Sequence, residues 1–196
     1  MDRGYIYLNK KSFLHNLEVL KNLSRKELCL VVKANAYGHG LEWAVKNAKE
    51  SGIKWFAVAS VDEGIQVKKV YEESRVLLLA EPSKSQLENI KENDIDLTVY
   101  NESFIDTLIE TGDEYSVHLK IDTGMHRLGC SPEKFYDLYK EIVDSDLNLI
   151  GICTHFPMAD TDETETKKSI ELFEKTISDI DSTNMLLHVD NSASTL

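Results

Sequence analysis

The sequence is poor in cysteine, in proline and in positive charge. Its three cysteines are scattered, which argues against a disulfide framework and against a zinc site. Lysine and arginine total 22 against 34 acidic residues, and the net charge of −12 disfavours nucleic acids and anionic membranes as partners. No apolar run approaches the length of a membrane span, and the N-terminus shows no signal-peptide pattern. We therefore expect a cytoplasmic protein without a metal site.

The sequence does contain a regular alternation of two patterns. Short apolar runs rich in branched residues are typical of buried strands, and amphipathic stretches with helical spacing separate them. Ser60 with Glu63, and Ser83 with Gln86, fit the capping-box pattern of helix starts. The seven apolar runs are residues 28–32, 55–59, 76–79, 95–99, 117–121, 147–153 and 186–189. Strands that alternate with helices in this way predict a parallel sheet covered by helices.

A doubly wound sheet and a (β/α)8 TIM-type barrel both fit this order of elements. Two features favour the barrel: the runs are evenly spaced, and unusual polar residues follow several strands instead of gathering at one switch point. A complete barrel has eight strands and about 250 residues, whereas this chain has 196 residues and seven runs. We therefore predict an α/β fold in which residues 1–196 form one incomplete barrel domain, a fragment without the eighth strand.

The motif VVKANAYGHG, at residues 31–40, places Lys33 at the end of the first apolar run. A strand-end lysine that reaches out to water is the ordinary interpretation. The alternative is an amine that burial keeps partly neutral, so that it can condense with an aldehyde. The position of the lysine alone leaves both interpretations open.

The motif LKIDTGMHRLG, at residues 119–129, combines a strand with a loop. Lys120 and Asp122 alternate with apolar residues, so they point into the barrel lumen if the apolar residues pack on the helices. A lysine in the lumen needs a partner or a modification. The loop then presents Arg127 above the barrel mouth, where arginine suits a carboxylate or a phosphate, although a lone loop arginine is by default an ordinary surface residue.

Two later motifs also follow apolar runs. GICTHFPMADTDE, at residues 151–163, carries His155, and a lone histidine at a strand end is more often a hydrogen-bonded core residue than a catalyst. LLHVDNSAS, at residues 186–194, carries Ser192 where barrels commonly hold a phosphate, although an ordinary helix N-cap also explains it. Neither motif decides between a functional and a structural role by itself.

Taken together and in order, these motifs resemble those of the alanine racemase family of pyridoxal-phosphate enzymes. The resemblance begins at YIYLNKKSFLHNLEVLK, residues 5–21, and continues through VVKANAYGHG, HLKIDTGMHRLG, THFPMAD and HVDNSAS. It therefore spans essentially the whole chain. It implies the N-terminal part of a fold-type III barrel that binds pyridoxal 5'-phosphate and interconverts L- and D-alanine.

The resemblance also implies roles for individual residues. Lys33 would bind the cofactor covalently and, once substrate displaces it, act as a base on one face of the substrate. Tyr37 would donate to the cofactor phosphate. Arg127 would lie near the phenolic oxygen of the cofactor and the substrate carboxylate, and His155 would pack against the pyridine ring.

Further positions follow from the same resemblance. Asn191 and Ser192 would belong to the phosphate region. Lys120 matches a lysine that can be carbamylated, and His188 matches a histidine that supports the residues around the cofactor. Racemisation also needs a base on the opposite face, which the family takes from a tyrosine in the C-terminal domain of the partner subunit. We therefore expect a homodimer in the full-length form and an inactive fragment, because that tyrosine lies outside these residues.

One residue departs from the family pattern. His126 precedes Arg127 where alanine racemases more often have glycine, and the spelling MHR resembles the serine/alanine racemases of the glycopeptide-resistance type. The expected substrate is therefore alanine, used to supply D-alanine for cell-wall peptides, with serine as the alternative. Three other interpretations stay open: a related barrel decarboxylase, a non-catalytic pyridoxal-phosphate carrier, and an apo fragment without a ligand.

Overall fold

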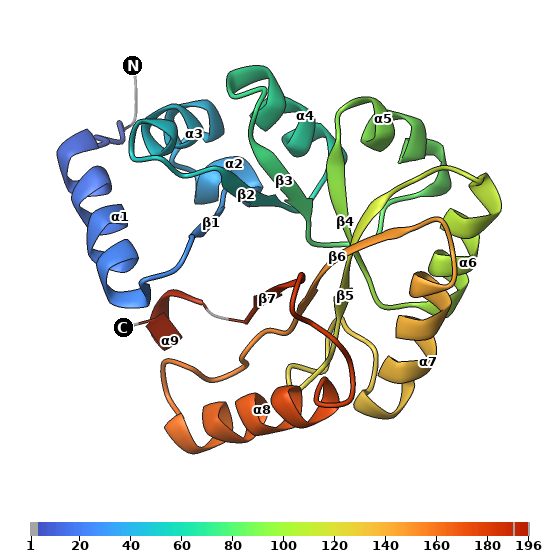
Figure 1. Ribbon diagram of the computed structural model, residues 1–196. Coiled ribbons are helices and arrows are strands. Elements are labelled where there is room, and N and C mark those ends of the chain that lie inside the picture. The colour runs from blue at the N-terminus through green and yellow to red at the C-terminus, as the bar shows by residue number, and fades with distance from the viewer. Residues whose placement is uncertain (1–3, 190, 196) are drawn as a thin grey trace.

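The computed structural model of the chain describes residues 4–189 and 191–195, so Asp190, within the fourth motif, lies outside the described residues. Within these residues the centre is one curled sheet of seven parallel strands in the order β1-β2-β3-β4-β5-β6-β7 (Figure 1). The strands are β1 (Cys29–Val31), β2 (Trp55–Val58), β3 (Arg75–Leu78), β4 (Ile95–Val99), β5 (Ser116–Lys120), β6 (Asn148–Cys153) and β7 (Leu186–His188). The predicted strands and their parallel order are confirmed, and the architecture is an incomplete α/β barrel.

Helices follow the strands and cover the outer face of the sheet (Figure 1). They are α1 (Lys10–Ser24), α2 (Lys33–Tyr37), α3 (Leu41–Glu50), α4 (Val61–Val70), the 3-10 turn η1 (Lys84–Gln86), α5 (Leu87–Glu92), α6 (Glu102–Thr111), α7 (Pro132–Val143), α8 (Glu163–Thr176) and α9 (Ser192–Thr195). The hydrophobic core fills the layer between helices and sheet, and Phe56, Ile105 and Phe135 are fully buried there. In the described part of the chain, none of the helices is long and apolar enough to cross a membrane.

The two faces of β5 show how the sequence builds this layer. Val117, Leu119 and Ile121 are fully buried and belong to the hydrophobic core. Because successive side chains of a strand point to opposite faces, His118 and Lys120 point away from that core, into the barrel. The predicted alternation of this strand is therefore present.

The barrel is open between its first and last strands. In the residues that the structure describes, β1 pairs with β2, β7 pairs with β6, and no pairing joins β1 to β7. Figure 1 shows the gap between them, with α9 beside α1, and these two helices are in contact. Two strand edges therefore keep backbone groups without a strand partner at the position that an eighth strand takes in a complete barrel.

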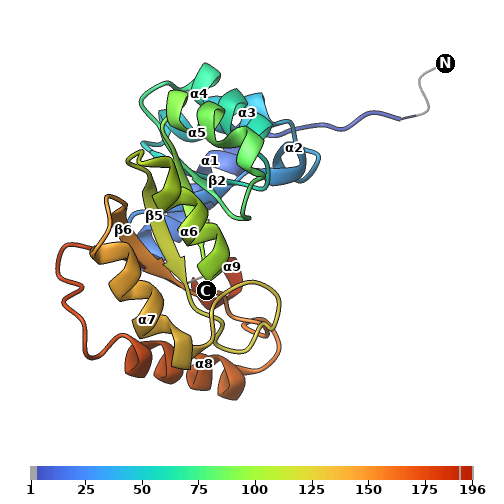
Figure 2. The same ribbon diagram turned by 90° about the vertical axis from the view of Figure 1, so that its right-hand side faces the viewer.

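The residues before α1 run away from the barrel (Figure 2). Tyr5, Ile6 and Tyr7 in this segment have exposed fractions of 96%, 76% and 82%. Side chains that stay in water gain nothing from apolar burial. This segment therefore contributes little to the stability of the barrel.

Candidate active site

Lys33 stands where the first strand meets the loop above it. The backbone N–H of Val32 donates to the carbonyl of Ala57 at 2.9 Å, which extends the pairing of β1 with β2 by one residue. Lys33 follows directly as the first residue of α2, and it is partly buried. The carboxyl ends of parallel strands share one rim, which is where barrels gather their catalytic side chains. Lys33 therefore lies on the functional rim of this fold.

The backbone after Lys33 winds in the left-handed sense. Ala34, Asn35, Ala36 and Tyr37 have φ values between 51° and 55°. For residues that carry a Cβ, this conformation costs roughly 1–2 kcal/mol each. The surrounding contacts must offset this strain, and strain of this kind gathers at functional sites.

Hydrogen bonds to Asn35 hold the left-handed turn in place. Its side-chain oxygen accepts from the N–H of Leu41 at 2.8 Å, and its carbonyl accepts from the N–H of Gly40 at 2.9 Å. Gly38 and Gly40 have φ values of 85° and 90°, which glycine adopts without a steric penalty. The glycines of the YGHG sequence are thus explained by the exit from this turn.

The Glu63 carboxylate forms other hydrogen bonds than the capping-box pattern predicts. The capping-box pattern predicts a carboxylate that reaches back to the N–H of Ser60. The structure forms half of that box, because the Ser60 hydroxyl accepts from the N–H of Glu63 at 3.3 Å. The carboxylate instead accepts from the N–H of Ala34 at 2.7 Å and from that of Ala59 at 3.0 Å. Glu63 therefore joins the loop after β1 to the loop after β2.

Three other predicted residues lie on the same rim as Lys33, and the charges of several of these residues affect one another. Burial lowers the pKa of Lys120; Cys153 opposes this effect, and Arg127 and Lys33 add to it. Burial also lowers the pKa of His155, and the charges of Lys120, Arg127 and Lys33 lower it further. Lys120 is the last residue of β5, Arg127 lies in the loop after it, and His155 follows β6. These three residues and Lys33 therefore lie at the carboxyl ends of strands, on one rim of the barrel.

This region carries positive charge that no ion pair within the described residues neutralises. Lys120 has an exposed fraction of 9%, and within the described residues its ammonium makes no hydrogen bond or ion pair. Lys33 and Arg127 add two cations, against one nearby carboxylate, Asp122. A buried cation is costly unless it is paired or neutralised. The rim therefore suits an anionic ligand, although the whole chain is acidic.

Asp122 fixes the base of the loop that carries Arg127. Its Oδ1 atom accepts from the N–H groups of Gly124 and His126, both at 3.0 Å. Burial alone would raise the pKa of Asp122, but these amides outweigh burial, and the pKa lies below its ordinary value. A Cβ on Gly129 would lie 2.6 Å from the backbone N of Asp122, so glycine is required where the loop closes. His126 has a φ of 52°, which explains why glycine suits this position.

Below the rim, two histidines meet inside the barrel. His118 Nδ1 lies 2.9 Å from His188 Nε2, and His118 Nε2 lies 4.0 Å from the carboxylate of Asp96. That carboxylate accepts a hydrogen bond from Arg75 at 2.8 Å. Burial, followed by the effects of His118 and Lys120, lowers the pKa of His188 to about 3. His188 is therefore a neutral partner for its neighbours at neutral pH.

The contact between these histidines depends on Gly151. The pairing of β5 with β6 shifts its register between Val117 and His118, which sets His118 opposite Gly151. A Cβ at that position would lie 2.5 Å from His118 Nδ1 and 2.7 Å from the carbonyl oxygen of Leu186. The missing side chain therefore makes room for the His118 ring to reach β7.

Three further predicted residues lie in the segments that follow β1 and β7. Tyr37 is exposed at the end of the left-handed turn, and Ser192 is exposed at the start of α9, which contacts α1. In the part of the chain that the structure describes, neither of them hydrogen-bonds to Lys33. Asn191 Nδ2 donates to the carbonyl of Phe156 at 3.5 Å, one residue beyond His155 in the chain. Tyr37, Asn191 and Ser192 thus also follow the carboxyl ends of strands, on the rim that carries Lys33.

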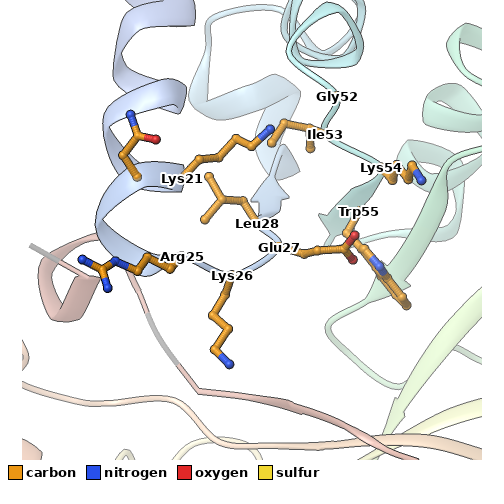
Figure 3. A pocket seen from close by; sticks show the side chains of 10 residues that line it. Lys21, Arg25, Lys26, Glu27, Leu28, Gly52, Ile53, Lys54 and Trp55 are labelled. Carbon is orange, nitrogen blue, oxygen red and sulfur yellow. The ribbon is translucent and has the colours of Figure 1, made fainter.

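Two surface cavities lie away from this rim. One of about 410 Å³ lies between the end of α1 and the starts of β1 and β2 (Figure 3). Of the side chains around it, Arg25, Lys26 and Lys54 point in different directions in Figure 3, so they do not converge on one anion. The other cavity, of about 620 Å³, lies between α1 and the end of α3. We take the rim as the candidate active site because groups of different chemistry meet there.

Sequence reasoning did not find Glu63 or His118 as parts of this site. For His118 there was a usable signal, because the alternation that places Lys120 in the lumen also places the residue two positions before it there. For Glu63 there was none, because its hydrogen bond to Ala34 joins residues 29 positions apart in the chain. Only the packing of α4 against the strands brings these two together.

Comparison with known sequences gives a consistent result. The profile of the family described as "Alanine racemase, N-terminal domain" matches residues 8–196. The alanine racemase of Treponema denticola is 36% identical over 192 residues, which cover 91% of this chain and 51% of that protein. An amino-acid racemase of Enterococcus faecalis is 35% identical over 182 residues, which cover 90% of this chain and 26% of that protein. The chain thus spans about half the length of the first relative and about a quarter of the second.

Solved structures agree with the sequence relatives. The alanine racemase of Clostridium difficile 630 superposes with a TM-score of 0.86 at 29% identity, covering 94% of this chain and 54% of that one. The histidine racemase of Leuconostoc mesenteroides subsp. sake superposes with a TM-score of 0.88 at 26% identity, covering 95% of this chain and 52% of that one. The similar structures therefore include racemases named for different amino acids.

Proposed function

The chain belongs to the alanine racemase family as its N-terminal domain, and from this premise we propose that it is the cofactor-binding barrel of a pyridoxal-phosphate-dependent amino-acid racemase. The observation that carries the proposal is Lys33 at the end of β1, on one rim with Lys120, Arg127 and His155. Residues 1–196 would form this one domain. The reaction would be the interconversion of L- and D-alanine, which supplies D-alanine for cell-wall peptides in the cytoplasm.

The chemistry of the rim fits pyridoxal phosphate. An aldehyde needs an amine to react with, and Lys33 offers one beside two further cations. A phosphorylated ligand needs compensating positive charge, which the rim supplies in a chain of net charge −12. When bound, the cofactor supplies an electron sink for the carbanion that forms when the substrate loses its Cα proton.

The residues of the chain would bind the cofactor and the substrate and transfer the proton. Lys33 would hold the cofactor and, when free, remove or return the Cα proton on one face of the substrate. Arg127 would bind the substrate carboxylate through its planar fork. His155 would pack against the cofactor ring. Tyr37, Asn191 and Ser192 would bind the phosphate.

Two residues would support this set from inside the barrel. Among the described residues the Lys120 ammonium forms no ion pair, and carbamylation of its amine would turn this cation into an anion that pairs with Arg127. His188 stays neutral next to Lys120, so it adds no charge to an already cationic region. Both roles concern the charge balance of the rim, because neither residue would react with the substrate.

Racemisation requires a base on each face of the substrate, and Lys33 serves only one. We propose that the second is a tyrosine of the C-terminal domain of the partner subunit in a homodimer. The chain alone would then bind the cofactor without racemising alanine. The alanine racemases of Treponema denticola and Clostridium difficile 630 are about twice as long as the matched region, which is consistent with a second domain in the active form.

Serine is the second candidate substrate. His126 stands next to Arg127 on the loop that would meet the substrate carboxylate. The Enterococcus faecalis relative carries the general name amino-acid racemase, and a similar structure is a histidine racemase. The family therefore accommodates more than one amino acid, and the residues near Arg127 are the first place to look for the difference.

The test is an assay of the full-length protein loaded with pyridoxal phosphate. L-alanine and L-serine are supplied in parallel, and the D-isomers are measured by chiral chromatography. We expect D-alanine to form, the Lys33→Ala variant to lose this activity, and the control Lys26→Ala, at the opposite end of the barrel, to keep it. No D-amino acid from the wild type, or full activity of Lys33→Ala, would contradict the proposal.

A further inference from the structure

The Glu63 carboxylate is hydrogen-bonded directly to the backbone that presents Lys33. It lies in the first turn of α4, and the Ser60 hydroxyl fixes its backbone by accepting from its N–H at 3.3 Å. From there the carboxylate bridges two loops of the rim. Oε1 accepts from the N–H of Ala34 at 2.7 Å, and Oε2 accepts from the N–H of Ala59 at 3.0 Å.

The bond to Ala34 acts on Lys33 through one peptide unit. The N–H of Ala34 and the carbonyl of Lys33 belong to the same rigid plane. Fixing the direction of this N–H therefore fixes the rotation about the Cα–C bond of Lys33. That rotation relates the lysine side chain to the turn that follows, and the turn begins its left-handed course at Ala34, with a φ of 51°.

The bond to Ala59 anchors the Glu63 carboxylate to the end of β2. Ala59 directly follows β2, which pairs with β1 through the register Val31↔Ala57. The carboxylate thus ties the strained turn to the end of a neighbouring strand. Two N–H donors meet two oxygens, and a carboxylate is the side-chain group that accepts with both.

We propose that Glu63 is a positioning residue for Lys33: its carboxylate holds the left-handed turn in register with β2 and so sets the direction in which the lysine amine enters the site. This inference rests on the proposed function of Lys33. Glu63 does not touch the substrate, and it acts only through the peptide between Lys33 and Ala34.

The same rim provides a matched control. The carboxylate of Glu81 also accepts from two backbone N–H groups, those of Tyr100 at 3.3 Å and Asn101 at 3.1 Å. These residues follow β4, so Glu81 bridges loops that do not carry Lys33. Both N–H groups reach the same oxygen of Glu81, Oε1, whereas the two N–H groups at Glu63 reach different oxygens. Glutamine at position 81 can therefore keep both bonds, but glutamine at position 63 sets its NH2 group against one N–H. Glu81→Gln removes the same charge from the rim without breaking a bridge between loops, so it controls for the loss of charge.

The experiment compares wild type, Glu63→Gln and Glu81→Gln in three measurements on the same chain. Amide hydrogen exchange reports on the N–H of Ala34 and Ala59. Acetylation by trace acetic anhydride across a pH series, read by mass spectrometry, reports the reactivity of Lys33 without any cofactor. Incubation with pyridoxal phosphate, with samples reduced by borohydride at intervals, gives the rate at which Lys33 is labelled.

We expect Glu63→Gln to speed exchange at Ala34 and Ala59 tenfold or more, to shift the pH profile of Lys33 acetylation, and to slow cofactor labelling of Lys33 tenfold or more. Glu81→Gln should leave both the acetylation and the cofactor labelling of Lys33 within twofold of wild type. The melting temperature of each variant is also recorded, so that the Lys33 rates are compared at a temperature at which all three proteins are folded.

The inference is overturned if Glu63→Gln leaves both the acetylation profile and the labelling rate of Lys33 at wild-type values. If Glu63→Gln does not fold, Glu63→Asp replaces it, because it keeps the charge but cannot reach both N–H groups, and the same criteria apply. If wild-type Lys33 reacts with acetic anhydride but never with pyridoxal phosphate, the proposed function fails. The acetylation profiles then decide on Glu63 alone.

Discussion

Replacing Gly151 with alanine tests the histidine contact inside the barrel. The new Cβ would lie 2.5 Å from His118 Nδ1 and 2.7 Å from the carbonyl oxygen of Leu186. Real Cβ atoms essentially never approach other atoms so closely, so something must move. The carbonyl belongs to the backbone of β7, whereas the His118 ring can rotate away. We expect the ring to move and its hydrogen bond to His188 to break.

The cost follows from two contributions. Overpacking of a dense interior costs about 1–3 kcal/mol. A buried hydrogen bond that loses its partner costs about 1–3 kcal/mol more, and in the described part of the chain His118 Nε2 already has no hydrogen-bond partner. The free energy of unfolding should therefore fall by about 2–6 kcal/mol, which is a large part of the stability of an ordinary domain.

Urea unfolding of wild type, Gly151→Ala, His118→Ala and the double variant measures this cost. Removing the ring relieves the closer of the two contacts, so the double variant should lose at least about 1 kcal/mol less than the sum of the single variants. The contact with Leu186 remains, so relief should be incomplete. A loss below about 1 kcal/mol for Gly151→Ala, or simple additivity in the double variant, would refute this account of the barrel interior.

Three further outcomes are expected. Burial holds the pKa of His188 at about 3, below 6.5 for a free imidazole, so the unfolded chain binds this proton more tightly than the folded chain. The free energy of unfolding should therefore fall as the pH drops from 6.5 towards 3, by up to about 1.4 kcal/mol per pH unit more in wild type than in His188→Gln. Urea unfolding at each pH measures this difference. Because His126 has a φ of 52°, His126→Gly should keep or raise the melting temperature and His126→Val should lower it by an amount equivalent to about 1–2 kcal/mol; equal melting temperatures would contradict the strain. Because burial lowers the pKa of Lys120 and favours the neutral amine that reacts with carbon dioxide, ¹³C-bicarbonate should give a carbamate resonance that Lys120→Arg lacks, and a resonance that persists in this variant would refute the assignment.

The fold was largely predictable because its strands are continuous apolar runs. The run at residues 117–121 alternates between core and lumen as expected, and it places Lys120 inside the barrel. The residues at which strands end were less predictable. The first run, predicted over residues 28–32, forms a strand only at Cys29–Val31, because the backbone turns into α2 directly after Val32. Strand ends depend on the loops that follow, and those loops are strained here.

The interior of the site was not predictable from sequence patterns. The shift in register at His118 places this side chain opposite Gly151, and no local sequence pattern predicts such a shift. The left-handed turn after Lys33 is almost as well hidden, because alanine and tyrosine give no sign of a positive φ. Asn35 and the glycines that end the turn are weak local hints, because asparagine and glycine adopt a positive φ more readily than other residues. Contacts across strands and helices, such as Glu63 with Ala34, exist only after the chain has folded.

The site that cofactor labelling identifies is the most direct measurement of the central claim. The chain is incubated with pyridoxal phosphate, reduced with borohydride, digested and examined by mass spectrometry. A phosphopyridoxyl group on Lys33, formed in preference to the other lysines, is the predicted result. A label on Lys120 or on exposed lysines without preference for Lys33, or no label at all, would contradict the claim that this rim binds an aldehyde cofactor through the amine at the end of β1.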